Sequence, residues 1–279
     1  MTTLAPSAAD ADNKLYVDSL IGDLAGWADP VGRLRTALEQ DEFILYTQTI
    51  RVLDDPGARQ FAEVLVRMQE EETSMLPPGA FLPGFEHYRM LPALDRWITS
   101  RLIGWLAAGG PAELGRGAEA SPRFSINLAR QTVGDALFPS FVAQQLARRN
   151  VPPHLLCFEV DDADASALPA QAASLASGLR SAGCRVLLDS FGRQNVSFES
   201  LRALRADYVK VDGSIVREVL RSPVALAKLR AIMRVGQVTG VGVIAECVED
   251  REVLEVLVKL GVRYVQGFGI SVPAPLAAR

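Results

Sequence analysis

The feature that most constrains the fold of this chain is a regular alternation of short β-rich runs with longer helical patterns. The runs lie at 43–48, 62–68, 123–128, 155–160, 185–189, 207–211, 242–246 and 263–267. The helical patterns lie at 31–40, 91–106, 138–149, 168–183, 197–205, 214–240 and 249–261. Such alternation predicts a mainly parallel sheet. Eight strands of near-continuous apolar character favour a closed α/β fold, a (β/α)8 TIM-like barrel.

One connection departs from this pattern. Residues 49–60, between the first and second runs, have no helical period and contain the turn signal Asp54-Asp55-Pro56-Gly57. A parallel crossover usually needs a dozen or more residues and a helix. We therefore predict that the first two strands are antiparallel, which an ordinary TIM barrel does not have.

The length of 279 residues and the 49% hydrophobic content suit one barrel domain with a large core. We expect a short N-terminal extension over 1–30, mobile in its first 13 residues, and the barrel domain over 31–279. Residues 107–122 are rich in Gly, Ala and Pro and are predicted to form a flexible loop.

Charge and composition exclude several classes of protein. The net charge is −4 and no long Lys/Arg run occurs, so neither DNA nor a membrane surface is an expected partner. No signal-peptide core and no uninterrupted apolar stretch of about 18 residues is present, which predicts a cytoplasmic protein. Cys157, Cys184 and Cys247 have no CxxC spacing and are expected to be reduced, mostly buried thiols.

Polar side chains occur where the predicted strands end. They are Asn127, Glu159, Asp189, Lys210, Glu246 and Gln266. Glu63 instead opens the second strand, and it joins the same barrel mouth if that strand runs opposite to the others. The C-terminal mouth of such a barrel usually carries the chemistry. A single strand-end acid is as readily a helix cap or a salt-bridge partner, so the prediction depends on the whole set converging.

Four carboxylates at one mouth remain ionised only if cations lie among them. Oxygen ligands favour Mg²⁺ or Mn²⁺, and the two histidines, His87 and His154, have no partner at zinc-ligand spacing. Such a metal site with Lys210 and Arg67 nearby suits a phosphate ester substrate. The sequence therefore indicates metal-assisted phosphoryl chemistry.

The same residues carry a family resemblance. The matching segments are Tyr46–Ile50 with Y-x-Q-P-I, Ala62–Arg67 with E-A-L-x-R, Ile126–Leu128 with x-N-L-S, Glu159–Asp162 with E-I/L-T-E, Asp189–Gly192 with D-D-F-G, Asp207–Asp212 with D-x-L/V-K-I/V-D, Ala245–Glu249 with A-E-G-V-E, and Gln266–Pro273 with Q-G-Y/F-x-x-S-K-P. In this order, over about residues 32 to 276, the chain resembles the EAL family of cyclic di-GMP phosphodiesterases.

The resemblance implies a role for each matching residue. Glu63, Asn127, Glu159 and Asp189 would bind a first Mg²⁺ or Mn²⁺ ion, and Lys210, Glu246, Glu249 and Gln266 would complete the catalytic surround. Gln48, Leu65 and Arg67 would contact cyclic di-GMP, Arg67 through a phosphate. The family reaction opens one phosphodiester bond of this bacterial second messenger and gives linear pGpG. The family barrel also has an antiparallel first strand.

The chain departs from the family at one strand end and the loop that follows. Ser190 stands where the second acid of D-D-F-G helps hold a second metal, so a second metal site is in doubt. The loop G-T-G-Y-S-S-L is altered to contain Arg193, Gln194 and Asn195, and any positive φ at Gln194 would be costly. Asp162 is a shorter acid than the Glu that anchors this loop.

These departures leave three functions open. The first is a receptor that binds cyclic di-GMP with weak or absent hydrolysis and signals to a protein partner. The second is an active phosphodiesterase with a modified second metal site. The third is a protein-interaction regulator that has lost the nucleotide, and an unrelated metal-dependent barrel enzyme would require all eight motif matches to be coincidence. The resemblance also favours a homodimer.

Overall fold

The structure is a computed structural model that describes residues 29–55, 61–69, 75–110, 123–194, 196 and 198–276. The predicted extension before residue 29, the predicted loop over 111–122, part of the turn after Asp55, and Asn195 lie outside these residues. None of the described helices is both long and apolar enough to cross a membrane.

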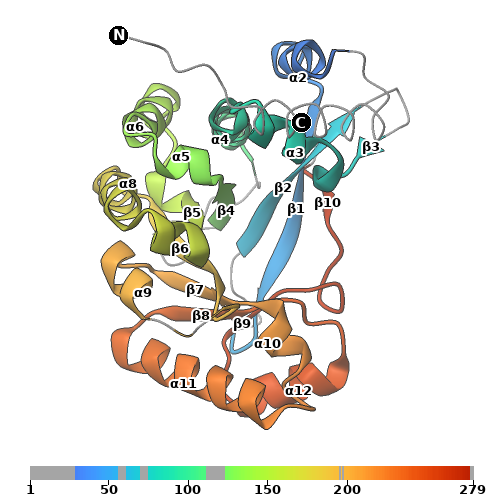
Figure 1. The fold of residues 1–279 in the computed structure, drawn as a ribbon, viewed down its shortest axis with the longest axis vertical. Coiled ribbons are helices and arrows are strands. Elements are labelled where there is room, and N and C mark those ends of the chain that lie inside the picture. Colours follow the sequence, from blue (N-terminus) through green and yellow to red (C-terminus); the bar gives the residue numbers. More distant parts are fainter. Residues whose placement is uncertain are drawn as a thin grey trace, which may run out of the picture.

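Eight strands close into a barrel (Figure 1). They are β1 (Phe43–Val52), β2 (Phe61–Gln69), β4 (Arg123–Leu128), β5 (Leu156–Asp161), β6 (Arg185–Phe191), β7 (Tyr208–Val211), β8 (Gly242–Ala245) and β9 (Tyr264–Val265). Each pairs with the next, and β1 closes the ring by pairing with both β2 and β9. The prediction of an α/β barrel is confirmed. Two short strands, β3 (Met75–Leu76) and β10 (Ala274–Pro275), extend this sheet and were not predicted.

The first strand is antiparallel, as predicted. β1 runs opposite to β2 with Gln48 facing Glu63, and it also runs opposite to β9. β2 is parallel to β4. The expectation that β2 runs opposite to the later strands and thereby brings Glu63 to their mouth is therefore wrong. The hairpin reverses only β1, because β2 resumes the direction that the six later strands share.

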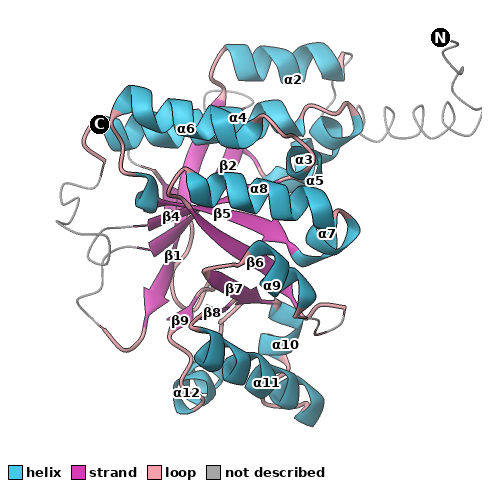
Figure 2. Ribbon diagram, turned by 90° about the vertical axis from the view of Figure 1, so that its left-hand side faces the viewer, coloured by secondary structure: helices cyan, strands magenta, loops and turns pink. Residues whose placement is uncertain are grey.

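Helices cover the outside of the barrel (Figure 2). Six of them match a predicted pattern: α2 (Pro30–Glu39), α4 (Leu91–Ala107), α6 (Phe138–Arg149), α8 (Pro169–Ser181), α9 (Glu199–Leu204) and α12 (Arg251–Lys259). The long helix predicted over 214–240 is wrong, because it is divided into α10 (Gly213–Arg217) and α11 (Pro223–Thr239). Pro223 cannot continue a helix from the preceding turn, and Ser222 instead caps a new one by accepting a hydrogen bond from the Ala225 N–H at 3.2 Å.

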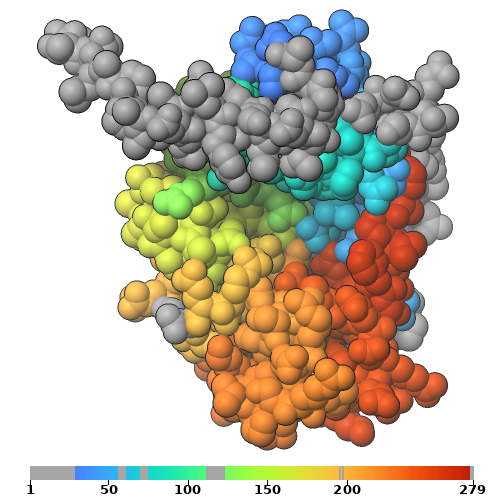
Figure 3. Space-filling model, turned by 45° about the vertical axis from the view of Figure 1, so that its right-hand side comes forward, coloured from blue at the N-terminus to red at the C-terminus, as the bar shows by residue number. Residues whose placement is uncertain are grey.

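Four shorter helical elements were not predicted. They are α3 (Pro78–His87), α5 (Arg130–Val133), α7 (Asp162–Ala167) and the 3₁₀ turn η1 (Pro153–Leu155). In α3 the prolines Pro78 and Pro83 conceal the helix in the sequence. The C-terminal part of the chain, orange to red, forms the lower half of the surface in Figure 3.

Inside the barrel, side chains lie in layers, as the alternation of a strand requires. A layer of apolar residues packs as one cluster across the interior: Ile50, Phe61, Cys157, Leu187, Tyr208, Ile244 and Tyr264. Each of these residues is two positions away, along its own strand, from a polar residue singled out in the sequence. The polar residues therefore form the next layer, on top of an apolar floor.

Candidate functional site

The tilt of the barrel strands brings the polar residues to one height. Glu63 in β2 faces Ser125 in β4, which is two residues before Asn127. Glu159 in β5 likewise faces Leu187 in β6, two residues before Asp189. Strands in a closed barrel are staggered in this way, so residues at one level advance along the chain from strand to strand. This stagger allows Glu63, near the start of its strand, to meet residues at the ends of the others.

Lys210 lies at the centre of the site. Its Nζ is 2.6 Å from Glu159 Oε2, 3.1 Å from Glu63 Oε2 and 3.9 Å from Asp189 Oδ1. Lys210 and Glu159 are each only 1% exposed. The ammonium thus supplies one of the positive charges that a group of buried carboxylates requires.

Two carboxamides complete the arrangement around Glu63. Asn127 donates to Glu63 Oε1 at 2.5 Å, and Gln266 donates to Glu63 Oε2 at 2.6 Å. The Gln266 amide also lies 3.0 Å from Gln48 Oε1, and Gln48 donates to the Ser271 carbonyl at 2.9 Å. Residues from β1, β2, β4 and the loop after β9 are therefore joined in one network.

The pKa values of the acids reflect a balance between burial and Lys210. For Glu63, the charge of Lys210 and three hydrogen bonds outweigh burial and lower the pKa. For Glu159, burial dominates and raises the pKa to about 8, although Lys210 opposes it. Burial also raises the pKa of Asp189, and it raises that of Glu246 to about 7. One ammonium is thus too little charge to keep every acid ionised at neutral pH.

The oxygen atoms of the site fit a hard divalent cation. Glu159 Oε1, Asp189 Oδ1 and Gln266 Oε1 are buried and have no hydrogen-bond partner among the residues that the structure describes. Buried oxygens without a donor are rare, and a cation would satisfy them. Within the described part of the chain, no three His, Cys, Asp or Glu side chains converge closely enough to hold a metal. Lys210 Nζ lies between the carboxylates, so closing them around an ion would displace it.

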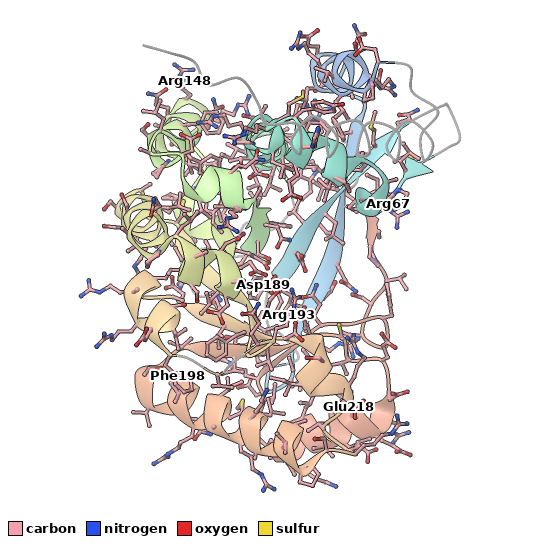
Figure 4. The ribbon with its side chains drawn as sticks, in the orientation of Figure 1. Arg67, Arg148, Asp189, Arg193, Phe198 and Glu218 are labelled. Carbon is pink, nitrogen blue, oxygen red and sulfur yellow. The ribbon has the colours of Figure 1, made fainter. Side chains whose placement is uncertain are left out.

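Other predicted residues lie around this centre or away from it. Glu246 accepts a hydrogen bond from the Gly213 N–H at 2.7 Å, whereas Glu249 is exposed in the loop after β8. Leu65 and Arg67 lie further along β2 than Glu63. The Arg67 guanidinium stacks on the Tyr46 ring, 4.4 Å from its centroid, and Figure 4 shows Arg67 well apart from Asp189.

Ser190 lies at an irregularity of the sheet. The pairing of β6 with β7 shifts between Leu188 and Phe191, and Ser190 has a φ of 57°. Its hydroxyl lies 3.4 Å from Asp189 Oδ2 and the residue is buried. Ser190 and Gly192 have positive φ and Gln194 does not, so no strain arises at Gln194.

Arg193 ties the altered loop to the neighbouring elements. Its Nε donates to Asp212 Oδ2 at 2.7 Å, and its Nη1 lies 4.0 Å from Asp161 Oδ2 (Figure 4). Asp162 begins α7 next to Asp161, and burial raises its pKa. The loop is therefore held by an arginine–aspartate pair.

Two buried acids near the site had no role in the sequence analysis. Asp212 directly follows β7. It caps α10 by accepting a hydrogen bond from the Ser214 N–H, and it pairs with Arg193. Asp95, in α4, accepts hydrogen bonds from the Ala129 N–H at 3.0 Å and the Thr132 hydroxyl at 2.5 Å. In the sequence, Asp95 could have been identified as an acid on the apolar face of an amphipathic helix.

Sequence comparisons give relatives of known name. Cyclic di-GMP phosphodiesterase PdeB of Shewanella oneidensis is 31% identical over 246 residues, which are 88% of this chain and 28% of that protein. Cyclic di-GMP phosphodiesterase PdeF of Escherichia coli is 29% identical over 278 residues, 99% of this chain and 35% of that protein. The chain thus spans about a third of the length of these relatives.

Solved structures of similar fold include EAL domains with bound nucleotide. The FimX EAL domain from Pseudomonas aeruginosa bound to c-di-GMP has a TM-score of 0.79 at 26% identity, covering 90% of this chain and 98% of that one. The PaMucR phosphodiesterase c-di-GMP complex has a TM-score of 0.75 at 26% identity, covering 88% and 97%. The sequence profile of the EAL domain matches residues 31–273. The chain belongs to the EAL domain family.

Proposed function

We propose that this chain binds cyclic di-GMP at the acidic mouth of its barrel, defined by Glu63, Asn127, Glu159, Asp189 and Glu246, and hydrolyses it weakly or not at all. The names of its relatives and of the similar complexes support the ligand. Arg67 and Gln48 lie on the two strands of the hairpin and would contact the nucleotide, Arg67 through a phosphate.

In this proposal a divalent cation, Mg²⁺ or Mn²⁺, is held by oxygens of Glu63, Asn127, Glu159 and Asp189. Such an ion offsets charge on phosphoryl oxygens and makes bound water more acidic. Lys210, moved from between the carboxylates, would then contribute a positive charge to the phosphodiester. Glu246, with a pKa raised to about 7, is able to take up a proton near neutral pH.

The observation that carries weak hydrolysis is Ser190. A neutral hydroxyl lies beside Asp189, at the position of the second acid in the D-D-F-G motif that this segment resembles. A two-metal site lacking one carboxylate binds its second cation less tightly. Arg193 of the altered loop also forms an ion pair with Asp212.

A second candidate is an active phosphodiesterase, because the oxygen set proposed for the first metal is complete. The two candidates are separated by incubating near-stoichiometric protein with cyclic di-GMP and Mn²⁺ and resolving the nucleotides by chromatography. We expect little or no pGpG from the parent chain. Rapid formation of pGpG that is lost in Glu63→Ala would establish the enzyme instead.

The role of Ser190 is tested in the same assay. We expect Ser190→Asp to raise turnover about tenfold or more, because it restores a carboxylate for the second cation. Aspartate also tolerates the positive φ of this position. Ser190→Asn, which has the same shape without the charge, is the matched control. Equal turnover of the two variants would remove Ser190 as the limiting feature.

Binding is tested by calorimetry with cyclic di-GMP. We expect Arg67→Ala to weaken binding about tenfold or more, because a charge-assisted contact to phosphate is lost. Arg148→Ala, an exposed arginine in α6, serves as the control. Absence of binding and of any thermal shift in the parent chain would favour a protein-interaction regulator.

We infer a cytoplasmic domain of residues 31–279 that acts as a homodimer or with a protein partner. Sedimentation of the full chain with and without cyclic di-GMP tests the dimer.

A further inference from the structure

A large cavity lies at the opposite mouth of the barrel from the acidic residues. Its volume is about 850 Å³, and its lining includes the starts of β6, β7, β8 and β9. Residues of α9 and α11, which are neighbours in Figure 2, form its walls. Cavities of this size accommodate small organic ligands.

Arginine dominates the charge of this cavity, which we call the arginine mouth. The charged residues that line it are Arg180, Arg185, Arg202, Arg205, Arg263 and Asp207. Five guanidinium groups face one carboxylate, in a chain whose net charge is −4. The positive charge is therefore concentrated locally and is not a property of the whole surface.

Some of these arginines have structural partners. Asp207 accepts from Arg180 at 2.7 Å and lies 3.5 Å from Arg185, and Arg263 pairs with Asp54 at 2.9 Å. One aspartate is thus shared by two guanidinium groups. The contacts fix the geometry of the arginines without neutralising the cluster.

Among the described residues, two exposed arginines and one buried nitrogen of this cavity lack such a partner. Arg202 and Arg205 form no ion pair with any residue that the structure describes, and the Nε of Arg185 is buried without a hydrogen-bond partner. The nearby charges of Arg185 and Arg123 add to burial in lowering the pKa of His154. The buried Nε donor of Arg185 and the local excess of positive charge both favour an anionic partner.

The floor of the arginine mouth is apolar and aromatic. Tyr208 and Tyr264 come from the inner apolar layer, and Phe198 lines the wall beside α9 (Figure 4). Gly242 lies beside these rings, and an added Cβ there would lie 2.6 Å from the Tyr208 ring. An anion with a flat apolar body would thus meet rings below and guanidinium groups at the rim.

We propose that the arginine mouth is a second ligand site, one that binds an organic phosphate of the size of a nucleoside diphosphate. The arginines engage the phosphates, and the apolar floor holds the heterocycle. The site is separated from the acidic mouth by the inner apolar layer, so the two ligands bind independently.

The test is calorimetry of the full chain with ADP as the probe, in low salt without divalent cation. We expect saturable binding of ADP, weaker binding of pyrophosphate and none of adenosine, with affinity that falls as salt rises. Arg202→Glu should weaken ADP binding at least about tenfold. Arg148→Glu is the matched control: it is also an exposed arginine in the last turn of a helix, at the other end of the molecule (Figure 4).

Several results would overturn the proposal. These are no ADP binding up to about 1 mM, a Kd for ADP equal to that for pyrophosphate, or equal losses of ADP affinity in Arg202→Glu and Arg148→Glu. Location is tested separately by arginine modification with phenylglyoxal and mass spectrometry. ADP should protect Arg185, Arg202 and Arg205 in the parent chain and equally in Arg67→Ala. Protection elsewhere, or displacement of ADP by cyclic di-GMP, would refute a separate site.

Discussion

The buried ammonium of Lys210 contacts Glu63 and Glu159, and its charge opposes the rise in pKa that burial causes in both acids. The strand-end acids and Lys210 can be placed at one mouth from the sequence, because strand direction and the two-residue alternation determine which side chains share a layer. The sequence does not reveal that Lys210 lies between Glu63 and Glu159, since that depends on barrel stagger and on side-chain rotamers. It also hides the Arg193–Asp212 pair, whose residues are separated by a whole strand.

Asp95 is a buried acid in α4 whose titration should affect the stability of the fold. Burial raises its pKa to about 6 from 3.8, with the Thr132 and Ala129 hydrogen bonds and the charge of Arg96 opposing. Between pH 4 and 6 the folded chain therefore binds a proton that the unfolded chain has released, and stability falls as pH rises through this range. Relative to Asp95→Asn, which keeps a carbonyl acceptor, the loss should reach at most about 3 kcal/mol.

Urea denaturation of the parent and Asp95→Asn at pH 4, 5, 6 and 7 measures this difference. Other titrating groups are common to both proteins and cancel. A constant difference across the series, or one that grows in favour of the parent, would contradict the raised pKa.

At the scale of elements, strands were predicted more accurately than connections. β4 begins and ends where its apolar pattern does, since Arg123–Leu128 is bounded by Pro122 and Ala129. The helix break at Ser222-Pro223 is visible in the sequence as a cap followed by proline, but the apolar period on both sides masks it. The two-residue strands β3 and β10 depend on tertiary pairing and have no sequence signal of their own.

The packing of α11 on β8 gives a second prediction. A Cβ at Gly236 would lie 2.5 Å from Val243 Cγ2 and 2.9 Å from the Val241 carbonyl oxygen. Alanine gains about 1 kcal/mol of helix propensity, but the helix must move from the sheet to accept it. We expect Gly236→Ala to lower the free energy of unfolding by about 1–2 kcal/mol net. Chemical denaturation measures it, with the exposed neighbour Gln237→Ala as control, and an unchanged or higher stability would show that α11 shifts freely.

For the whole molecule, the main feature is a barrel with acids at one mouth and arginines at the other. The inner apolar layer lies between the two, so the side chains of one mouth do not contact those of the other. Composition cannot reveal this polarity, because a net charge of −4 averages over both ends.

The acidic mouth should make global stability depend on divalent cations. An ion that binds only the folded chain stabilises it by about 2.7 kcal/mol when the free ion concentration is one hundred times its Kd. We expect Mn²⁺ to raise the melting temperature of the parent but not of Glu63→Ala, with one tightly bound ion per chain by equilibrium dialysis. Glu252→Ala, an exposed acid in α12, should respond as the parent does. An equal response in Glu63→Ala would place the ion elsewhere.

The reversed first strand has a consequence for how the chain is made. β1 pairs with β2, its neighbour in sequence, on one edge, and with β9, more than two hundred residues later, on the other. Until the ribosome has released that last segment, β1 presents an edge with unpaired N–H and C=O groups. A chain that terminates before Tyr264 would therefore have an open barrel with an unpaired edge on β1. We expect such fragments to aggregate.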